Sequence, residues 1–192
     1  MNQQDRAVTP VISTILVVAI VVILAATVSV AFLGITENIT EPAPIVADTT
    51  GKFEAGAGGD DQIVRITHVA GDSIKVENIE IIVRASGPDT DLPTEARLVN
   101  LPGDGYFSRS LADQNIQGNK DLISQSFETD DQIIVVEDSN IWKAGDTIQF
   151  RIKKTGGADF SESPSGPRAD KLEVVIVHTG SNSIISEHTF TT

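Results

Sequence analysis

The sequence predicts a long apolar N-terminal α-helix followed by an all-β head, an antiparallel β-sandwich of immunoglobulin-like or related type. Three observations lead to this fold class. No charged residue occurs from Val11 to Ile35. From Gln62 onward, short segments alternate apolar and polar residues with the period of two that half-buried strands show. No segment after Gln62 has the periodicity of an amphipathic helix.

The apolar segment is long enough to cross a membrane. Its 25 uncharged residues would span about 37 Å as an α-helix, more than the roughly 30 Å of a bilayer's hydrocarbon core. Thr9 and Pro10 are typical of a helix start, because Thr caps free backbone N–H groups and Pro lacks one. We therefore expect the helix to start at Thr9 or Pro10, within an N-terminal hydrophobic helical region that covers residues 8–38. Arg6 before it, against acids after it, favours a cytoplasmic N-terminus.

A linker is expected between the helix and the head, over residues 39–61. Pro42 and Pro44 end the helix, and the GAGGDD run lacks the pattern of a strand. Its glycines do not form a phosphate-binding loop, because no Lys-Ser/Thr pair follows them. Just before the prolines, Asn38-Ile39-Thr40 is the one N-x-S/T sequon in the chain. It is a candidate N-glycosylation site at Asn38 and Thr40.

The head is predicted to cover residues 62–192. Eight segments have strand-like patterns: 63–69, 73–76, 80–84, 96–101, 132–136, 147–152, 172–177 and 183–190. Two sequence segments, which we call phrases, share the pattern Ala-Gly-Asp-Ser/Thr-Ile: His68-Val-Ala-Gly71-Asp72-Ser-Ile and Trp142-Lys-Ala-Gly145-Asp146-Thr-Ile. Gly tolerates positive φ and Asp bonds nearby backbone, so we expect equivalent hairpin turns at both places.

The charge of the chain excludes some partners. The formal net charge is −13, with 27 acidic against 14 basic residues. Nucleic acids and anionic lipid surfaces attract clustered Lys and Arg, so neither is expected to bind. The acidity favours a high-salt habitat, where screening removes the self-repulsion, with ordinary acidic solubility as the alternative. The chain has no cysteine, hence neither disulfides nor cysteine-bound metals.

No metal or cofactor site is predicted. The three histidines, His68, His178 and His188, lie in strand patterns without a second ligand at i+2 or i+4, whereas zinc needs three or four converging ligands. The acidic run Asp89-Thr-Asp91 with Glu95 lacks the spaced loop of a calcium site, so a solvated loop is favoured.

No catalytic constellation is predicted either. There is no G-x-S-x-G motif, and no Ser-His-Asp set follows from spacing. The adjacent acids Asp60-Asp61 and Asp130-Asp131 would point apart and are read as surface charge. The chain is therefore not expected to be an enzyme.

The residues at the N-terminal end of the apolar segment point to a particular protein family. Arg6-Ala7 followed by Val8-Thr9-Pro10-Val11-Ile12 resembles the N-terminus of archaeal type IV pilins, in particular the haloarchaeal group that begins with an R-A-V-S-P-V-I-like motif. Thr9 stands where Ser is usual, and Ser13 where Gly is common. The His-x-x-Gly-Asp-x-Ile phrase more loosely resembles the heads of these pilins. Archaellins share the cleavage logic, but their typical start, G-I-G-T-L-I-V-F, is absent.

The resemblance implies a processing site and a set of partners. In that family a prepilin peptidase cuts after the small residue that follows the basic one, which here falls between Ala7 and Val8, with Arg6 before the cut. Residues 1–7 would then be a leader peptide of the class III type. Bacterial type IV pilins carry a Glu where Ile12 stands, so assembly through that carboxylate is not carried over.

The function that the resemblance implies is a structural subunit of an archaeal adhesion pilus. It would polymerise with copies of itself through the N-terminal helix, with the acidic head at the filament surface, served by the peptidase, an assembly ATPase and a membrane platform. It would lie in the membrane before assembly and in an extracellular filament afterwards. The alternatives are a monomeric membrane-anchored binding domain, a minor-pilin-like or archaellin-like subunit, and a secreted domain cut near Ala31.

Overall fold

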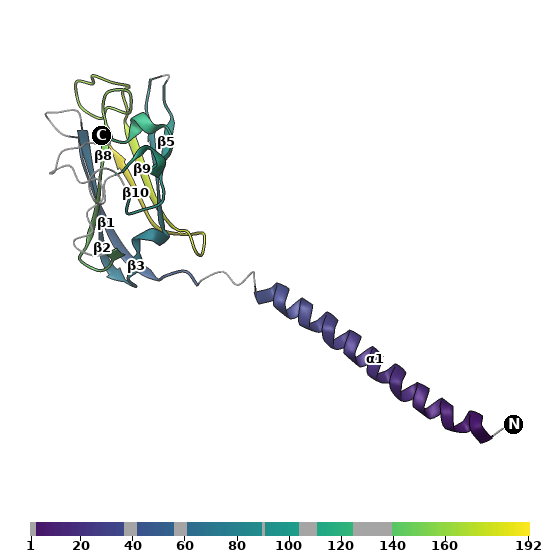
Figure 1. Cartoon of the computed structure of the whole chain (residues 1–192). Helices are drawn as coiled ribbons and strands as arrows, with labels where there is room; N and C mark the ends of the chain where they lie inside the picture. The colour runs from purple at the N-terminus through teal and green to yellow at the C-terminus, as the bar shows by residue number, and fades with distance from the viewer. Residues whose placement is uncertain (1–2, 37–41, 56–60, 90, 104–110, 125–139) are drawn as a thin grey trace. The chain divides into compact units, whose positions relative to one another are not determined.

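The computed structural model describes residues 3–36, 42–55, 61–89, 91–103, 111–124 and 140–192 (Figure 1). The chain divides into two compact units, Met1–Glu41 and Pro42–Thr192. The first contains the apolar helix and the second is the head.

The described part of the first unit is one helix, α1, which runs from Gln3 to Thr36. It begins earlier than the expected start at Thr9 or Pro10. The residues before Thr9 are mostly good helix formers, and the helix continues through Pro10 although this residue lacks the N–H for one backbone hydrogen bond. Within α1, Ile12–Val30 is a 19-residue candidate membrane span with a mean hydropathy of 2.7.

The hydroxyl groups inside this span do not interrupt it. Thr27 Oγ1 donates to the carbonyl oxygen of Leu24 at 2.9 Å, and Ser29 Oγ donates to that of Ala25 at 2.8 Å. Each hydroxyl therefore bonds within its own helix, as Ser and Thr do where no water is available. Because these two hydroxyl groups bond within the helix, they do not need a polar partner outside it.

The described residues of the head form antiparallel strands in three sheets (Figure 1). A three-stranded sheet has the order β1-β2-β8, a five-stranded sheet has the order β10-β9-β4-β5-β6, and β3 pairs with β7. The strands are β1 (Val46–Glu54), β2 (Asp61–Gly71), β3 (Ile74–Lys75), β4 (Ile79–Ser86), β5 (Thr94–Leu98), β6 (Ile116–Gly118), β7 (Ile141–Trp142), β8 (Thr147–Lys153), β9 (Lys171–His178) and β10 (Ser183–Thr191). This confirms the predicted fold class, an apolar helix followed by an antiparallel, sandwich-like all-β domain.

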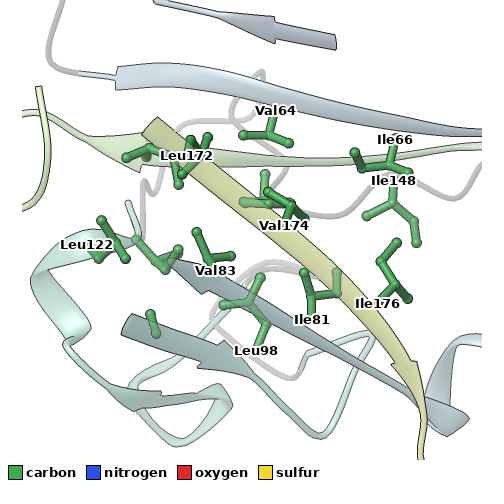
Figure 2. Close-up of a cluster of buried hydrophobic side chains, with 14 of the residues drawn as sticks. Val64, Ile66, Ile81, Val83, Leu98, Leu122, Ile148, Leu172, Val174 and Ile176 are labelled. Atoms are coloured by element: carbon green, nitrogen blue, oxygen red, sulfur yellow. The ribbon is translucent and has the colours of Figure 1, made fainter. Parts of the chain in front are cut away.

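The core lies between the two larger sheets. Alternate residues of β4 and β8 are buried, as expected for strands with one face toward a core. Figure 2 shows side chains from both sheets meeting there, with Val64 and Ile148 opposite Val174 and Ile81. Every residue of this core belongs to the head. The head therefore buries its own apolar surface without the helix.

Most of the predicted strands are found. The segments 63–69, 73–76, 80–84, 96–101, 147–152, 172–177 and 183–190 correspond to β2, β3, β4, β5, β8, β9 and β10. The predicted strand 132–136 lies outside the described residues. The short strands β6 and β7 were not predicted.

The linker assigned to residues 39–61 needs correction, because its middle forms β1. This strand, VADTTGKFE, pairs with β2 from Val46↔Gly71 to Glu54↔Ile63. Its sequence lacks an apolar alternation because it is the edge strand of its sheet, and only part of it faces the core. Pairing with β2, rather than its own pattern, decides its conformation.

Candidate functional site

The surface of α1 is the feature of the chain that most needs a partner. The large apolar side chains from Ile12 to Val30 are 48–70% exposed, and four consecutive ones, Ile15 to Val18, are all exposed. Four consecutive residues cover a full turn, so α1 is apolar on every side. A helix of this kind is stable only when lipid or other apolar helices surround it.

The predicted processing site lies near the start of this helix. Arg6, Ala7 and Val8 are all within the helical backbone of α1. The glycosylation candidates Asn38 and Thr40 lie outside the described residues.

The two similar phrases in the head meet at one corner, but they are not hairpin turns. Gly71 and Gly145 have the expected positive φ, 127° and 95°. However, β2 pairs with β8 and β3 pairs with β7, so neither turn joins paired strands. Each turn lets its chain pass from one sheet to another. Together they bend one antiparallel ribbon.

The first residues of the two similar phrases make equivalent hydrogen bonds at this corner. His68 Nε2 bonds the carbonyl oxygen of Asp72 at 3.1 Å, and Trp142 Nε1 donates to that of Asp146 at 3.2 Å. The two rings meet edge to face, with centroids 5.0 Å apart. Their strands are linked by bonds from the His68 amide to Asp146 O, 3.0 Å, and from the Gly145 amide to His68 O, 2.8 Å. The similarity of the two phrases therefore serves packing.

The histidines do not converge on a metal site. Within the described ranges, no group of three or more His, Cys, Asp or Glu side chains could hold a metal ion. His178 Nδ1 lies 2.8 Å from Ser181 Oγ, and His188 Nε2 lies 3.0 Å from Thr49 Oγ1. Burial lowers the pKa of His188, and the charge of Asp48 offsets this only in part.

The acidic residues considered as calcium ligands also serve structural contacts. Asp89 Oδ2 accepts the Arg168 amide at 2.6 Å. The carboxylate of Glu95 accepts from Arg84 at 2.7 Å and from Arg97 at 3.0 Å. Both hydrogen bonds lower the pKa of Glu95, and the bond from Arg84 has the larger effect. Asp60, Asp130 and Asp131 lie outside the described residues.

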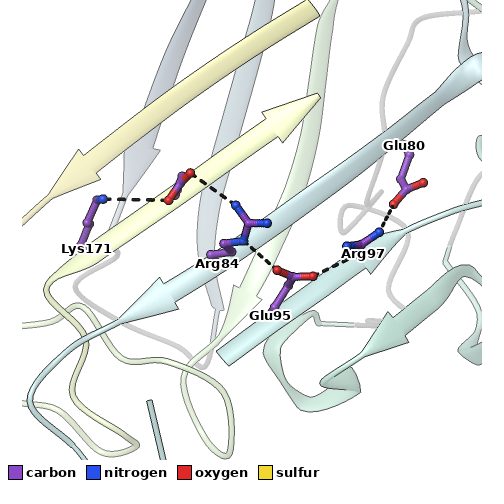
Figure 3. Close-up of polar contacts among 6 residues, drawn as sticks. Glu80, Arg84, Glu95, Arg97 and Lys171 are labelled. Carbon is purple, nitrogen blue, oxygen red and sulfur yellow. Dashed lines mark hydrogen bonds and ion pairs between the residues drawn. The ribbon is translucent and has the colours of Figure 1, made fainter. Parts of the chain in front are cut away.

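A row of ion pairs crosses the outer face of the five-stranded sheet (Figure 3). It joins strands β9, β4 and β5 through Lys171, Glu173, Arg84, Glu95, Arg97 and Glu80, and we call it the ion-pair row. Consecutive N–O distances along it are 3.9, 3.6, 2.7, 3.0 and 3.3 Å. This row was not predicted from the sequence. Its residues alternate with core residues along each strand, but the pairing of the strands was unknown.

Fold and surface together define a class: a β-sandwich head attached to a helix that must be covered by lipid or by other helices. Residues 6–47 match the family described as archaeal type IV pilin, N-terminal. The N-terminal segment of this chain is thus that of the archaeal type IV pilin family, as the Arg6-Ala7-Val8 resemblance predicted. The match ends within β1 and leaves the rest of the head outside it. No curated protein matches the chain.

Proposed function

We propose that the chain is the structural subunit of an archaeal type IV adhesion pilus, with polymerisation as its activity. One observation carries the proposal: α1 is apolar on every side over Ile12–Val30, in the segment that matches the pilin family. A single-span anchor needs only lipid around it. A pilin helix needs a surface that suits lipid first and neighbouring helices afterwards.

The energetics of assembly follow from that surface. Lipid tails and apolar side chains are similar surroundings, so moving α1 from the bilayer into a bundle of equivalent helices changes little apolar hydration. Close packing between helices then favours the bundle. The heads, each with its own core, would form the outside of the filament, and adhesion to surfaces would be their role.

Processing would precede assembly. A prepilin peptidase would cut between Ala7 and Val8, removing the polar leader that includes Arg6, and would leave the apolar helix on the mature chain. The assembly ATPase and its membrane platform would then extract the helix from the bilayer. The acidic composition, with a net charge of −13, supports a haloarchaeal setting, in which the Debye length falls to about 3 Å at 1 M salt. A glycan on Asn38 would lie outside the membrane.

Processing and assembly are tested together by sequencing the N-terminus of sheared surface filaments and imaging the filaments by electron microscopy. We expect mature subunits to begin at Val8. Arg6→Asp and Ala7→Asp should retain the leader and abolish filaments. Gln4→Asp is the matched control for Ala7→Asp, because it adds the same single negative charge within the leader but away from the junction. Filaments that form normally with Arg6→Asp and Ala7→Asp would contradict the scheme.

The intact mass of the protein separates the alternatives. A monomeric membrane anchor would retain residues 1–7 in the mature chain. A secreted domain cut near Ala31 would lose the whole apolar segment. A pilin loses only the leader.

A further inference from the structure

The outward face of the five-stranded sheet carries an apolar block. Strand register places Val177 beside Ile184 of β10, and Val175 beside Ile82 of β4. These four residues alternate with core residues such as Val174 and Ile176, so they lie on the side away from the core. Ile184 is 62% exposed, whereas Val175 is only 5% exposed, although it lies outside the core cluster. Ile184 is thus the exposed member of an apolar block in which Ile82 and Val177 are half-buried and Val175 is buried.

The ion-pair row borders this block. Arg84 and Glu173 follow Ile82 and Val175 at the next outward position of their strands, and Arg97 pairs with Ile82 across β4 and β5. Charged residues around a small apolar patch are the arrangement found at many protein–protein interfaces. Because each charge of the ion-pair row already has an opposite partner, covering the row leaves none of its charged groups unpaired.

The charges also indicate what covers the face. The ion-pair row is neutral, and Glu187, opposite Val175 on β10, brings the charge of the face to −1, in a chain of net charge −13. Two copies of the head repel each other wherever acidic surfaces meet, and only weakly where this face, with a charge of −1, meets its equal. Signs alternate along the row, from Lys171 to Glu80 (Figure 3). A two-fold rotation reverses that order and sets each cation opposite an anion.

We propose that the outward face of the five-stranded sheet is a homotypic contact that pairs the heads of two copies of this chain. The inference rests on the proposed function for its context. Subunits within one helical filament are related by the same screw operation, so their contacts are heterologous. A two-fold contact instead uses the same surface on both partners and closes after two copies. The face would therefore join heads of neighbouring filaments and bundle the filaments side by side.

The test uses filaments of the full chain, imaged by electron microscopy and followed by light scattering. Wild-type filaments should associate laterally. Ile184→Asp, which puts a charge in the apolar block, should leave single filaments of normal length. Val69→Asp is the matched control, since Val69 is also exposed but lies on β2 of the other sheet. Bundles that persist in Ile184→Asp, or that disperse equally in Val69→Asp, overturn the inference.

A second measurement separates this inference from the proposed function. The fragment 42–192 contains the whole core of the head, so its self-association can be measured by sedimentation. The wild-type fragment should form dimers, and Ile184→Asp should weaken the dimer at least tenfold. If the full chain forms no filaments, the proposed function fails, and this measurement alone decides the inference. A wild-type fragment that then stays monomeric would overturn it.

Discussion

Gly51 on β1 lies directly against the ring of His188 on β10, and a Cβ atom added at Gly51 would lie 2.7 Å from His188 Cγ. The same atom would lie 2.9 Å from Phe190 Cζ. The two strands come from different sheets, and each is an edge strand of its own sheet. Glycine at this position therefore lets one side of the sandwich close.

Gly51→Ala should destabilise the head, because the rings of His188 and Phe190 must move away from the new methyl group. Overpacking of this kind costs about 1–3 kcal/mol. Chemical denaturation of the fragment 42–192 measures the effect. Thr50→Ala is the control, since Thr50 is exposed on the same strand and its change should be within about 0.5 kcal/mol. Equal effects would mean that the close approach is unimportant.

The His188 contact should make stability depend on pH. Burial lowers the pKa of His188 below its ordinary value of 6.5, so below pH 6.5 the unfolded chain binds a proton that the folded head resists. The stabilisation is therefore present above pH 6.5 and is lost as pH falls through the lowered pKa. Unfolding free energies measured between pH 7.5 and 5 should fall with pH. The slope should be smaller in His188→Phe, and an unchanged slope would assign the effect to other groups.

Asp159 should stabilise the loop between β8 and β9 through its charge. Its side chain accepts hydrogen bonds from the amides of Ser161 and Ser165, at 2.9 and 2.7 Å, and from both hydroxyls. Burial alone would raise the pKa of Asp159, but these bonds outweigh it and lower the pKa. This stability is present above the ordinary pKa of 3.8 and is lost as pH falls below it.

Asp159→Ala removes all four hydrogen bonds and should cost about 2–4 kcal/mol, because the amides and hydroxyls of Ser161 and Ser165 lose a charged acceptor. Asp159→Asn keeps one acceptor oxygen and should cost less. Denaturation at pH 7 compares the two variants. The acid-induced loss near pH 3 should also be reduced in Asp159→Asn, whereas equal stability of all three proteins would contradict the charge-based argument.

The sequence predicted the fold class because the surroundings of the helix and those of the strands require different patterns of apolar residues. A helix that faces apolar surroundings on every side needs an uncharged run, and strands with one face in a core need alternation. Both patterns are local. The Arg6-Ala7-Val8 junction is also local, and it led to the family that the match over residues 6–47 bears out.

What the sequence could not predict depends on contacts between distant residues. The conformation of strand β1 is set by its pairing with β2. The loop that follows β8 is held by the side chain of Gln62: its Nε2 donates to Ala158 O at 2.6 Å, and its Oε1 accepts from the Phe160 amide at 2.8 Å. The ion-pair row likewise joins residues of three strands. The repeated Gly-Asp phrase was read as two hairpins for the same reason, because a bend and a hairpin share their turn residues and differ only in which strands pair.

Trp142 should be the side chain that holds this bend together. It is fully buried, packs against His68, and donates its indole N–H to Asp146 O. Trp142→Ala should cost about 3–5 kcal/mol, as large-to-small changes of buried aromatic residues do. Trp142→Phe keeps most of the packing and loses the hydrogen bond, so it should cost about 1–2 kcal/mol. Denaturation of the head fragment measures both, and a Phe variant as unstable as the Ala variant would assign the bend to the indole hydrogen bond instead of to packing.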